Sequence, residues 1–504
     1  MSVLRKPVPR KLRIALVVAV AFMALPAATV RAAARMPVGF YDDPSFRWST
    51  DTAANLKSAQ KANADVVHVL ADWSAIAPTK PSSPLNPKDP AYHLADLDQF
   101  VRSAQQYGMQ VLLTISQTPK WANGGQTPNH PPTNLNNLTL FAQMLATHYN
   151  GTKRGYGVVN MFSIWNEPNL ELFLTPQFSG NTIVSPGIYA KLFMAGYKGI
   201  KKGNPHALVA AGETSNRGHN HPTSPASENS VAPATFAHDL AVANPNLPFD
   251  AWATHPYPSV YALGPGQRVA YPNVGFSTMS KFGASLKEWF HRSVPIWVTE
   301  YGEQTSPAAK LYGPISLAKQ AADAKQVLEL AEANPYVQMF IWFIFRDSTP
   351  LTPTGGTWSS GVETASGAKK PAYNAFAGEA GKLIGETVAV QSGSSFALTL
   401  PVPIMAYRNT AGKPIGVQYK IKSGSNVVAS GDPLTKITAN GTITFPVAFD
   451  APKGKKATYT MSVVTSDRGG FTESTTVAIV ANSTATPINP LPAKGKKAPK
   501  PTKK

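Results

Sequence analysis

Eight short apolar runs recur between residues 36 and 385, and this repeat is the feature that most constrains the fold. Each run is rich in β-branched residues and ends in polar or aromatic ones, and a loop and a helix-like stretch follow. Near-continuous apolar strands that alternate with helices are typical of a parallel sheet covered on both faces. The expected strands are residues 38–41, 66–70, 110–115, 158–165, 207–211, 251–255, 296–299 and 337–345.

The number of strand–helix units favours a closed (β/α)8 TIM barrel, an α/β fold of about this length. An open, doubly wound sheet is the structural alternative. Such a sheet usually carries a glycine-rich phosphate-binding turn after its first strand, and no G-x-G-x-x-G motif follows residues 38–41. We therefore predict a barrel over residues 36–385, with helices near residues 97–107, 138–148, 188–201, 235–243, 279–290 and 317–333.

The pattern changes after residue 385. Short β-like runs between turn signals fill residues 386–482, which predicts a C-terminal β-sandwich of immunoglobulin-like type. Three tyrosines of this region are scattered rather than clustered (Tyr407, Tyr419 and Tyr459). This distribution favours a spacer or stabilising module over a carbohydrate-binding one.

Both ends of the chain differ from the rest. Residues 1–34 combine a basic start, an apolar run over residues 14–28 and small-residue cleavage sites, as in a signal peptide. The apolar run is shorter than the roughly 20 residues of a membrane span. We therefore expect a cleaved signal, no stable membrane insertion, and a secreted, extracellular or cell-envelope protein. A Pro/Lys-rich tail over residues 483–504 is expected to be disordered.

The formal net charge of +19 is not a nucleic-acid signal, because much of the basic excess lies at the two ends. The Lys-rich tail is either a solubilising segment or a contact for an anionic cell-envelope polymer. The chain has no cysteine, which excludes cysteine nucleophiles and thiolate metal sites. No His or Asp cluster has metal-ligand spacing, so we expect neither a metal nor a cofactor.

Two glutamates follow strands on opposite sides of the predicted ring. Glu167 comes after the fourth strand and Glu300 after the seventh, at the C-terminal rim where barrel enzymes carry their chemistry. Cleavage of an acetal needs one protonated carboxyl to donate to the departing oxygen and one carboxylate to attack carbon or activate water. The pair therefore predicts a glycoside hydrolase.

The Asn-Glu-Pro sequence at residues 166–168, paired with Thr299-Glu300, resembles the clan A barrel glycosidases. The closest resemblance is to glycoside hydrolase families 5 and 39, which are cellulase-like and β-xylosidase-like, over roughly residues 36–385. The segment from Ser360-Gly361 to Lys370-Pro371 is similar to the family's connection from strand 8 to its helix.

The resemblance implies a role for each matching residue. Glu167 would be the general acid/base and Glu300 the nucleophile of a retaining reaction through a covalent glycosyl-enzyme. Asn166 would hold the hydroxyl next to the anomeric carbon. His255 and Tyr257 resemble the pair that shapes the site near the nucleophile, where a tyrosine hydroxyl would keep Glu300 ionised.

Other residues are less constrained. Trp342 resembles the aromatic floor beneath the sugar, and Trp121 could line a glycan cleft or pack in the core. His68 stands where family members commonly carry an arginine that supports the nucleophile, which puts the ionisation of Glu300 in question. Glu213 and Glu303 are rival carboxylates, for which supporting or surface roles are expected.

The sequence thus predicts a secreted retaining β-glycosidase that hydrolyses β-linked poly- or oligosaccharides. One alternative is a carbohydrate-binding envelope protein that kept the barrel but lost turnover. The other is a transglycosylase that uses the same residues with a sugar acceptor. The sugar, and endo or exo action, depend on loops such as residues 122–138 and 173–186.

Overall fold

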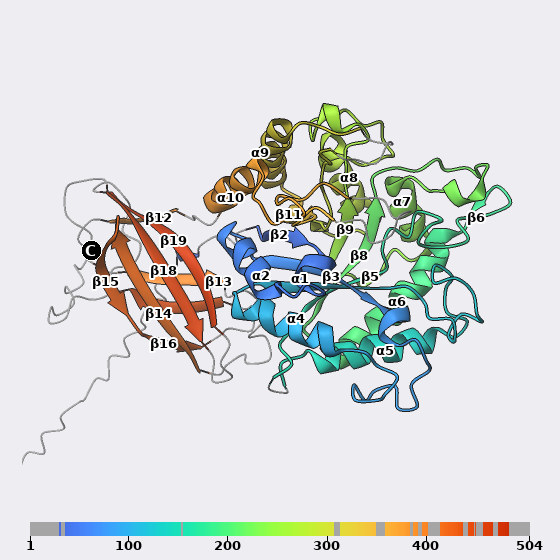
Figure 1. Cartoon of the computed structure of the whole chain (residues 1–504), viewed down its shortest axis with the longest axis horizontal. Helices are drawn as coiled ribbons and strands as arrows, with labels where there is room; N and C mark the ends of the chain where they lie inside the picture. Colours follow the sequence, from blue (N-terminus) through green and yellow to red (C-terminus); the bar gives the residue numbers. More distant parts are fainter. Residues whose placement is uncertain are drawn as a thin grey trace, which may run out of the picture.

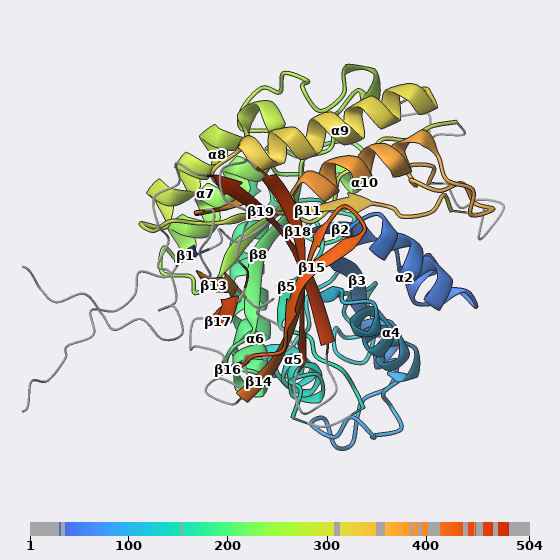
Figure 2. The same cartoon turned by 90° about the vertical axis from the view of Figure 1, so that its left-hand side faces the viewer.

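The computed structural model describes residues 30–31, 36–152, 155–306, 313–348, 358–383, 387–391, 396–401, 414–436, 442–447, 449, 457–466 and 472–482. The expected tail, Tyr407 and all of the expected signal peptide except Val30–Arg31 lie outside these residues. Figure 1 shows the chain from one side and Figure 2 after a quarter turn.

Eight parallel strands close into a barrel, which confirms the predicted fold of this part of the chain. Each strand pairs with the next, and the last pairs with the first through Phe340–Val38 and Phe343–Tyr41. The strands are β2 (Val38–Tyr41), β3 (Val66–Asp72), β4 (Gln110–Ser116), β5 (Met161–Ile164), β8 (Leu208–Ser215), β9 (Ala251–His255), β10 (Ile296–Val298) and β11 (Val337–Phe343).

A helix follows every barrel strand, and these helices form the outer layer seen in Figure 1. Some begin at polar caps: the Ser316 hydroxyl accepts a hydrogen bond from Lys319 N at 3.1 Å and starts α9. The helices are α2 (Thr52–Lys61), α4 (Ala95–Gln106), α5 (Leu135–His148), α6 (Ser185–Gly203), α7 (Pro233–Ala243), α8 (Phe276–Trp289), α9 (Leu317–Ala333) and α10 (Pro371–Leu383).

Short elements fill the connections between the strands and the main helices. They are α1 (Asp43–Phe46), α3 (Trp73–Ile76), the hairpin of β6 (Phe178–Ser179) with β7 (Thr182–Ile183), and the 3-10 turns Ala226–Glu228 and Tyr261–Leu263. Most follow the C-terminal ends of barrel strands. They therefore add material at the end of the barrel that carries Glu167 and Glu300.

Alternation along the strands separates two apolar cores. One core faces the helices, and the other fills the barrel: Val66, Leu112, Met161, Ala210, Ala251, Ala253, Trp297, Met339 and Ile341. Because side chains alternate, the residue two positions further along each strand faces the mouth. This layer contains His68, Thr114, Ser163, His255, Thr299 and Phe343.

The C-terminal strands form a second β region. Six of them make a sheet: β12 (Thr387–Gln391), β14 (Pro414–Ser423), β15 (Asn426–Gly431), β16 (Leu434–Lys436), β18 (Ala457–Ser466) and β19 (Thr472–Asn482). A smaller sheet contains β1 (Val30–Arg31), β13 (Phe396–Pro401) and β17 (Thr442–Val447). Tyr419 of the larger sheet stacks on Phe445 of the smaller one at 6.2 Å. The immunoglobulin-like arrangement stays a prediction.

Candidate active site

Glu167 projects from a tight turn after β5. Trp165 and Glu167 both have positive φ angles, 70° and 39°, a backbone conformation that residues other than glycine seldom adopt. The turn is held by backbone hydrogen bonds: Trp165 N donates to Ile115 O at 2.7 Å, and Glu167 N donates to Glu213 O at 2.9 Å. The neighbouring strands therefore fix the direction of the Glu167 side chain, which is 15% exposed.

Glu213 reaches the mouth because β8 contains an irregularity. The register with β9 shifts between Gly212 and Thr214, and Glu213 has a φ of 49°. A Cβ atom at Gly212, whose φ is +99°, would lie 2.6 Å from both Ala253 O and the Trp252 ring, so only glycine fits there. Such bulges re-aim side chains next to active sites. The side chain of Glu213 is fully buried.

Glu300 follows β10 and is almost fully buried. The Tyr257 hydroxyl donates to its Oε2 atom at 2.8 Å. Burial raises the pKa of Glu300, and the nearby Glu167 charge adds to this effect, whereas the charge of His255 and the Tyr257 hydrogen bond lower it. The resulting pKa is about 7. The hydrogen bond from Tyr257 is the contact that the resemblance implies.

His255, the last residue of β9, joins the carboxyl groups. Its Nδ1 atom lies 3.0 Å from Glu167 Oε1 and 3.6 Å from Glu300 Oε2, and its Nε2 atom lies 2.8 Å from Glu213 Oε2. Burial lowers the pKa of His255, but the Glu300 charge and the hydrogen bonds to Glu167 and Glu213 raise it more, so the pKa lies well above its usual value. The structure thus brings Glu167, Glu300 and His255 into one cluster.

His68 supports the backbone in front of Glu300. Its Nδ1 atom lies 3.2 Å from Thr299 O and its Nε2 atom 2.6 Å from Thr114 Oγ1. Burial lowers the pKa of His68 to about 4, so the ring is neutral near pH 7. A carbonyl only accepts, so Nδ1 carries the proton and Nε2 accepts from Thr114. Among the described residues, His68 makes no hydrogen bond to Glu300, so it does not take over the role implied for the arginine.

The prediction that Trp342 forms the floor of the site is wrong. Trp342 is fully buried in the layer between barrel and helices, and its indole N–H donates to Ser360 O at 2.8 Å. The barrel interior contains Met339 and Ile341, so alternation turns Phe343, not Trp342, toward the mouth. Phe343 is half-buried and lies 5.0 Å from the Tyr41 ring.

Asn166 and Trp121 remain predictions as binding residues. Asn166 directly precedes Glu167 and is partly exposed, with no hydrogen bond to another residue in the described part of the chain. The indole of Trp121 donates to Ala77 O at 2.8 Å and meets Trp73 edge-to-face at 5.7 Å. Both tryptophans line a small pocket with Tyr92 and other residues, and this pocket does not include Glu167 or Glu300.

Trp358 is a candidate site residue that the sequence analysis did not identify. Its half-buried ring lies 5.3 Å from Phe343 and 6.4 Å from Tyr257, edge-on to both. Its backbone pairs with Ser348: Ser348 N donates to Trp358 O at 2.9 Å, and Trp358 N donates to Ser348 Oγ at 2.5 Å. The only signal in the sequence is an aromatic residue just before the Ser360-Gly361 segment.

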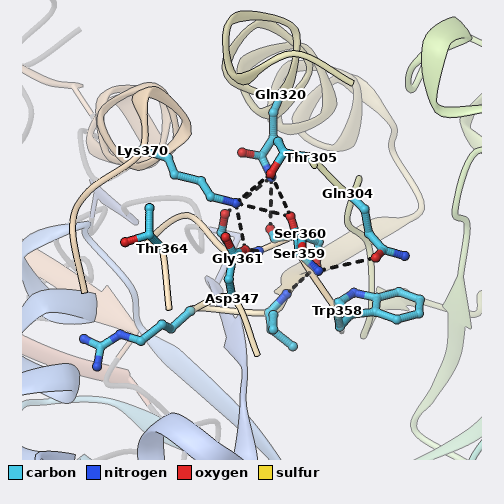
Figure 3. A network of polar contacts seen from close by, with 12 residues as sticks. Gln304, Thr305, Gln320, Asp347, Trp358, Ser359, Ser360, Gly361, Thr364 and Lys370 are labelled. Atoms are coloured by element: carbon cyan, nitrogen blue, oxygen red, sulfur yellow. Dashed lines mark hydrogen bonds and ion pairs between the residues drawn. The ribbon is translucent and has the colours of Figure 1, made fainter. Parts of the chain in front are cut away.

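A buried polar network holds the segment after Trp358 (Figure 3). The Lys370 ammonium donates to Asp347 Oδ1 at 2.7 Å, to Thr305 Oγ1 at 3.0 Å and to Ser359 O at 3.2 Å. From α9, the Gln320 amide donates to Ser360 O at 3.2 Å. Because these groups come from separate elements, they hold the segment in place and thereby fix the position of Trp358.

Glu303 lies on the same loop as Glu300 but does not join the His255 cluster. It accepts a short hydrogen bond from the Tyr301 hydroxyl. Burial, together with Asp323 nearby, raises its pKa from the usual 4.5 to about 9, so Glu303 is protonated at neutral pH. It fits the supporting role expected from the sequence.

We expect Glu303→Gln to make the stability of the protein less sensitive to a rise in pH between about 4.5 and about 9. The folded protein holds the Glu303 proton more tightly than the unfolded chain. The resulting contribution to the free energy of unfolding is fully present below about pH 4.5 and is lost as pH rises through about 9. The wild type should lose up to about 1.4 kcal/mol per pH unit in this window from Glu303 alone. Thermal unfolding across pH measures the effect. The exposed Glu329→Gln is the control, and parallel curves for all three proteins would contradict the prediction.

Two further observations concern the described residues alone. No group of three or more His, Asp or Glu side chains among them is placed to hold a metal ion. Within the same residues, no helix combines the length and apolar character of a membrane span.

A (β/α)8 barrel with two carboxyl groups at its C-terminal mouth is the arrangement found in barrel glycoside hydrolases. The sequence matches the family model of cellulase, glycosyl hydrolase family 5, over residues 32–347. This match spans more than half of the chain, so the chain belongs to glycosyl hydrolase family 5, within the clan A barrels.

Solved structures agree in fold. The chain is similar to a family 39 glycoside hydrolase from Bacteroides cellulosilyticus WH2, with 16% identity, 82% of this chain and 79% of that chain covered, and a TM-score of 0.51. A glucosidase from Croceicoccus marinus has 13% identity, coverage of 83% and 95%, and a TM-score of 0.51. GH5_18 from Streptomyces cattleya, solved with GlcNAc, has 16% identity, coverage of 72% and 86%, and a TM-score of 0.50. No curated protein matches the sequence.

Proposed function

We propose that the protein is a secreted retaining β-glycosidase that hydrolyses β-linked poly- or oligosaccharides, with Glu167 as general acid/base and Glu300 as nucleophile. The observation that carries the proposal is that both carboxyl groups face one nitrogen atom of His255, at 3.0 and 3.6 Å. Two oxygen atoms this close to the same nitrogen must also lie close to each other. A short separation favours the roughly 5–5.5 Å between the carboxyl groups of retaining glycosidases over the roughly 6.5–9.5 Å of inverting ones.

The two steps follow from the surroundings of the two carboxyl groups. Glu300 attacks the anomeric carbon while Glu167 protonates the departing oxygen, and Glu167 then removes a proton from the water that releases the sugar. The Tyr257 hydrogen bond and the His255 charge favour the ionised form of Glu300, which the attack requires. Glu167 is the more exposed of the two carboxyl groups, which suits a group that exchanges protons with substrate and water.

Export is supported by residues 1–34, and contact with an anionic envelope polymer by the Lys-rich tail. Fractionation of the source cells with an antibody to the barrel would test both. A protein confined to the cytoplasm would contradict the export proposal.

The decisive experiment measures release of aryl alcohols from β-glycosides and of reducing ends from β-glucans, mannans and xylans. Proton NMR of the first product should show the β anomer, because two inversions restore the starting configuration. An α product would contradict the proposed mechanism. Longer saccharides as the main products would favour the transglycosylase, and affinity for a polysaccharide without turnover would favour the binding protein.

We expect Trp358→Ala to raise KM for oligosaccharides by about tenfold or more. A half-buried indole beside Phe343 and Tyr257 offers an apolar face to a sugar ring, and loss of such a contact costs on the order of 1 kcal/mol or more. Steady-state kinetics measures the change. Trp289→Ala is the matched control, because Trp289 ends α8 just before β10, at the other end of the barrel. Equal KM values for the Trp358 variant and the wild type would exclude the contact.

A further inference from the structure

The fully buried Glu213 is not used by the two-step reaction, yet it contacts Glu167, His255 and Thr299. Its backbone oxygen accepts from Glu167 N at 2.9 Å. Its side-chain Oε2 lies 2.8 Å from His255 Nε2 and accepts from the Thr299 hydroxyl at 2.6 Å, directly before Glu300. An isolated buried carboxylate is costly, so a buried carboxylate is retained only with such partners.

The hydrogen bonds of this cluster indicate which of its atoms carry protons. Burial raises the pKa of Glu213, but the hydrogen bond and the charge of His255 lower it more, so Glu213 is ionised and accepts from both the Thr299 hydroxyl and the His255 ring. On the other side, His255 Nδ1 faces Glu167 Oε1 and Glu300 Oε2, and Glu300 Oε2 accepts from Tyr257. Both ring nitrogens thus face acceptors, which is the environment of a doubly protonated imidazolium.

We propose that Glu213 is a positioning residue that holds His255 as a cation between Glu167 and Glu300. The Glu213 charge offsets the cost of burying this cation, and the cation in turn stabilises ionised Glu300. Glu167 can still carry a proton, because the carbonyl oxygen of a protonated carboxyl also accepts from Nδ1. The inference deepens the proposed function and rests on it for its catalytic meaning.

The groups that face His255 come from several elements. They are Glu213 from β8, Glu167 after β5, Glu300 after β10 and Tyr257 after β9. His68 from β3 interacts electrostatically with the ring only when both rings are protonated. His68 is neutral near pH 7, because burial lowers its pKa to about 4. Glu213 is therefore the only one of these groups that combines full burial with a negative charge and takes no part in the two chemical steps.

The test combines Glu213→Gln, which keeps the shape and the acceptor but removes the charge, with Glu213→Asp, which keeps the charge. In ¹⁵N-histidine NMR, His255, assigned by its loss in His255→Gln, should carry protons on both nitrogens at pH 7 in the wild type and in Glu213→Asp. It should lose one proton in Glu213→Gln. The acid limb of kcat/KM should move up by about one pH unit in Glu213→Gln, because Glu300 loses a neighbouring cation.

Glu303→Gln is the matched control, because it replaces another buried carboxyl outside the His255 cluster, and both readouts should stay as in the wild type. A neutral His255 in the wild type would overturn the inference, as would an unchanged acid limb and ring in Glu213→Gln. If Glu213→Gln does not fold, the wild-type spectrum still tests the inference, because it shows whether His255 carries protons on both nitrogens. NMR needs no turnover, so a failure of this inference is distinguishable from a failure of the proposed glycosidase activity.

Discussion

Glu300→Ala is expected to lower kcat/KM by on the order of 10⁴-fold or more while leaving the fold intact. In the proposed mechanism the variant loses the attacking carboxylate, so no glycosyl-enzyme can form. Removal of a buried carboxyl with a raised pKa also relieves a desolvation cost, so the thermal unfolding temperature should not fall steeply. Initial rates on an activated aryl β-glycoside measure the loss.

Rescue of the Glu300→Ala variant by azide tests the role of Glu300 more directly. In Glu300→Ala the small anion enters the vacated space and attacks the substrate once, so rescue should yield an α-glycosyl azide of inverted configuration. Glu303→Gln, which removes a carboxyl three residues away, should retain near wild-type rates and show no azide product. Full activity in Glu300→Ala would exclude Glu300 as the nucleophile and direct attention to Glu213 or Glu167.

Glu167→Ala is expected to lose about 10²- to 10⁴-fold in rate on substrates whose leaving group needs a proton. For dinitrophenyl glycosides, whose leaving group departs without one, the first step should be nearly unchanged and the second step should become limiting. The glycosyl-enzyme should then accumulate and give a burst of released phenol. Stopped-flow absorbance with leaving groups of graded pKa measures both effects.

The configuration of the azide product separates the roles of the two carboxyl groups. In Glu167→Ala, azide attacks the glycosyl-enzyme on Glu300 and needs no general base, so the product should be a β-glycosyl azide of retained configuration. An equal loss in rate for all leaving groups would contradict the role of Glu167 as acid. The α product of Glu300→Ala and the β product of Glu167→Ala together would assign both residues.

Much of the barrel could be predicted from the sequence because its determinant is local. Each barrel strand is buried on both faces and therefore appears as a nearly continuous apolar run. The expected strands 38–41 and 251–255 coincide with β2 and β9, and the others differ mainly at their ends. Glu167 and Glu300 could be selected because they directly follow such runs, and position at a strand end is itself a sequence property.

The residues on the wall of the site could not be predicted in the same way. An apolar run does not say which of its two faces is inside the barrel, and the sequence therefore predicts Trp342, rather than Phe343, at the mouth. Only closure of the barrel decides this, because it places Met339 and Ile341 inside and ties the Trp342 indole to Ser360, 18 residues later. Trp358 lies at the mouth because Lys370 and Gln320, on neighbouring elements, hold the carbonyl oxygens of Ser359 and Ser360 directly after it.

The sequence by itself determined the barrel class and the choice of the two carboxyl groups, since the apolar runs of the strands and the residues that directly follow them can be read from the sequence. Tertiary structure alone decided their electrostatics. The irregularity in β8 turns Glu213 inward, and His255 meets it from 42 residues away while contacting Glu167 from 88 residues away. Charge interactions depend on distance in space and on exclusion of water, and neither quantity exists until the strands close into a barrel.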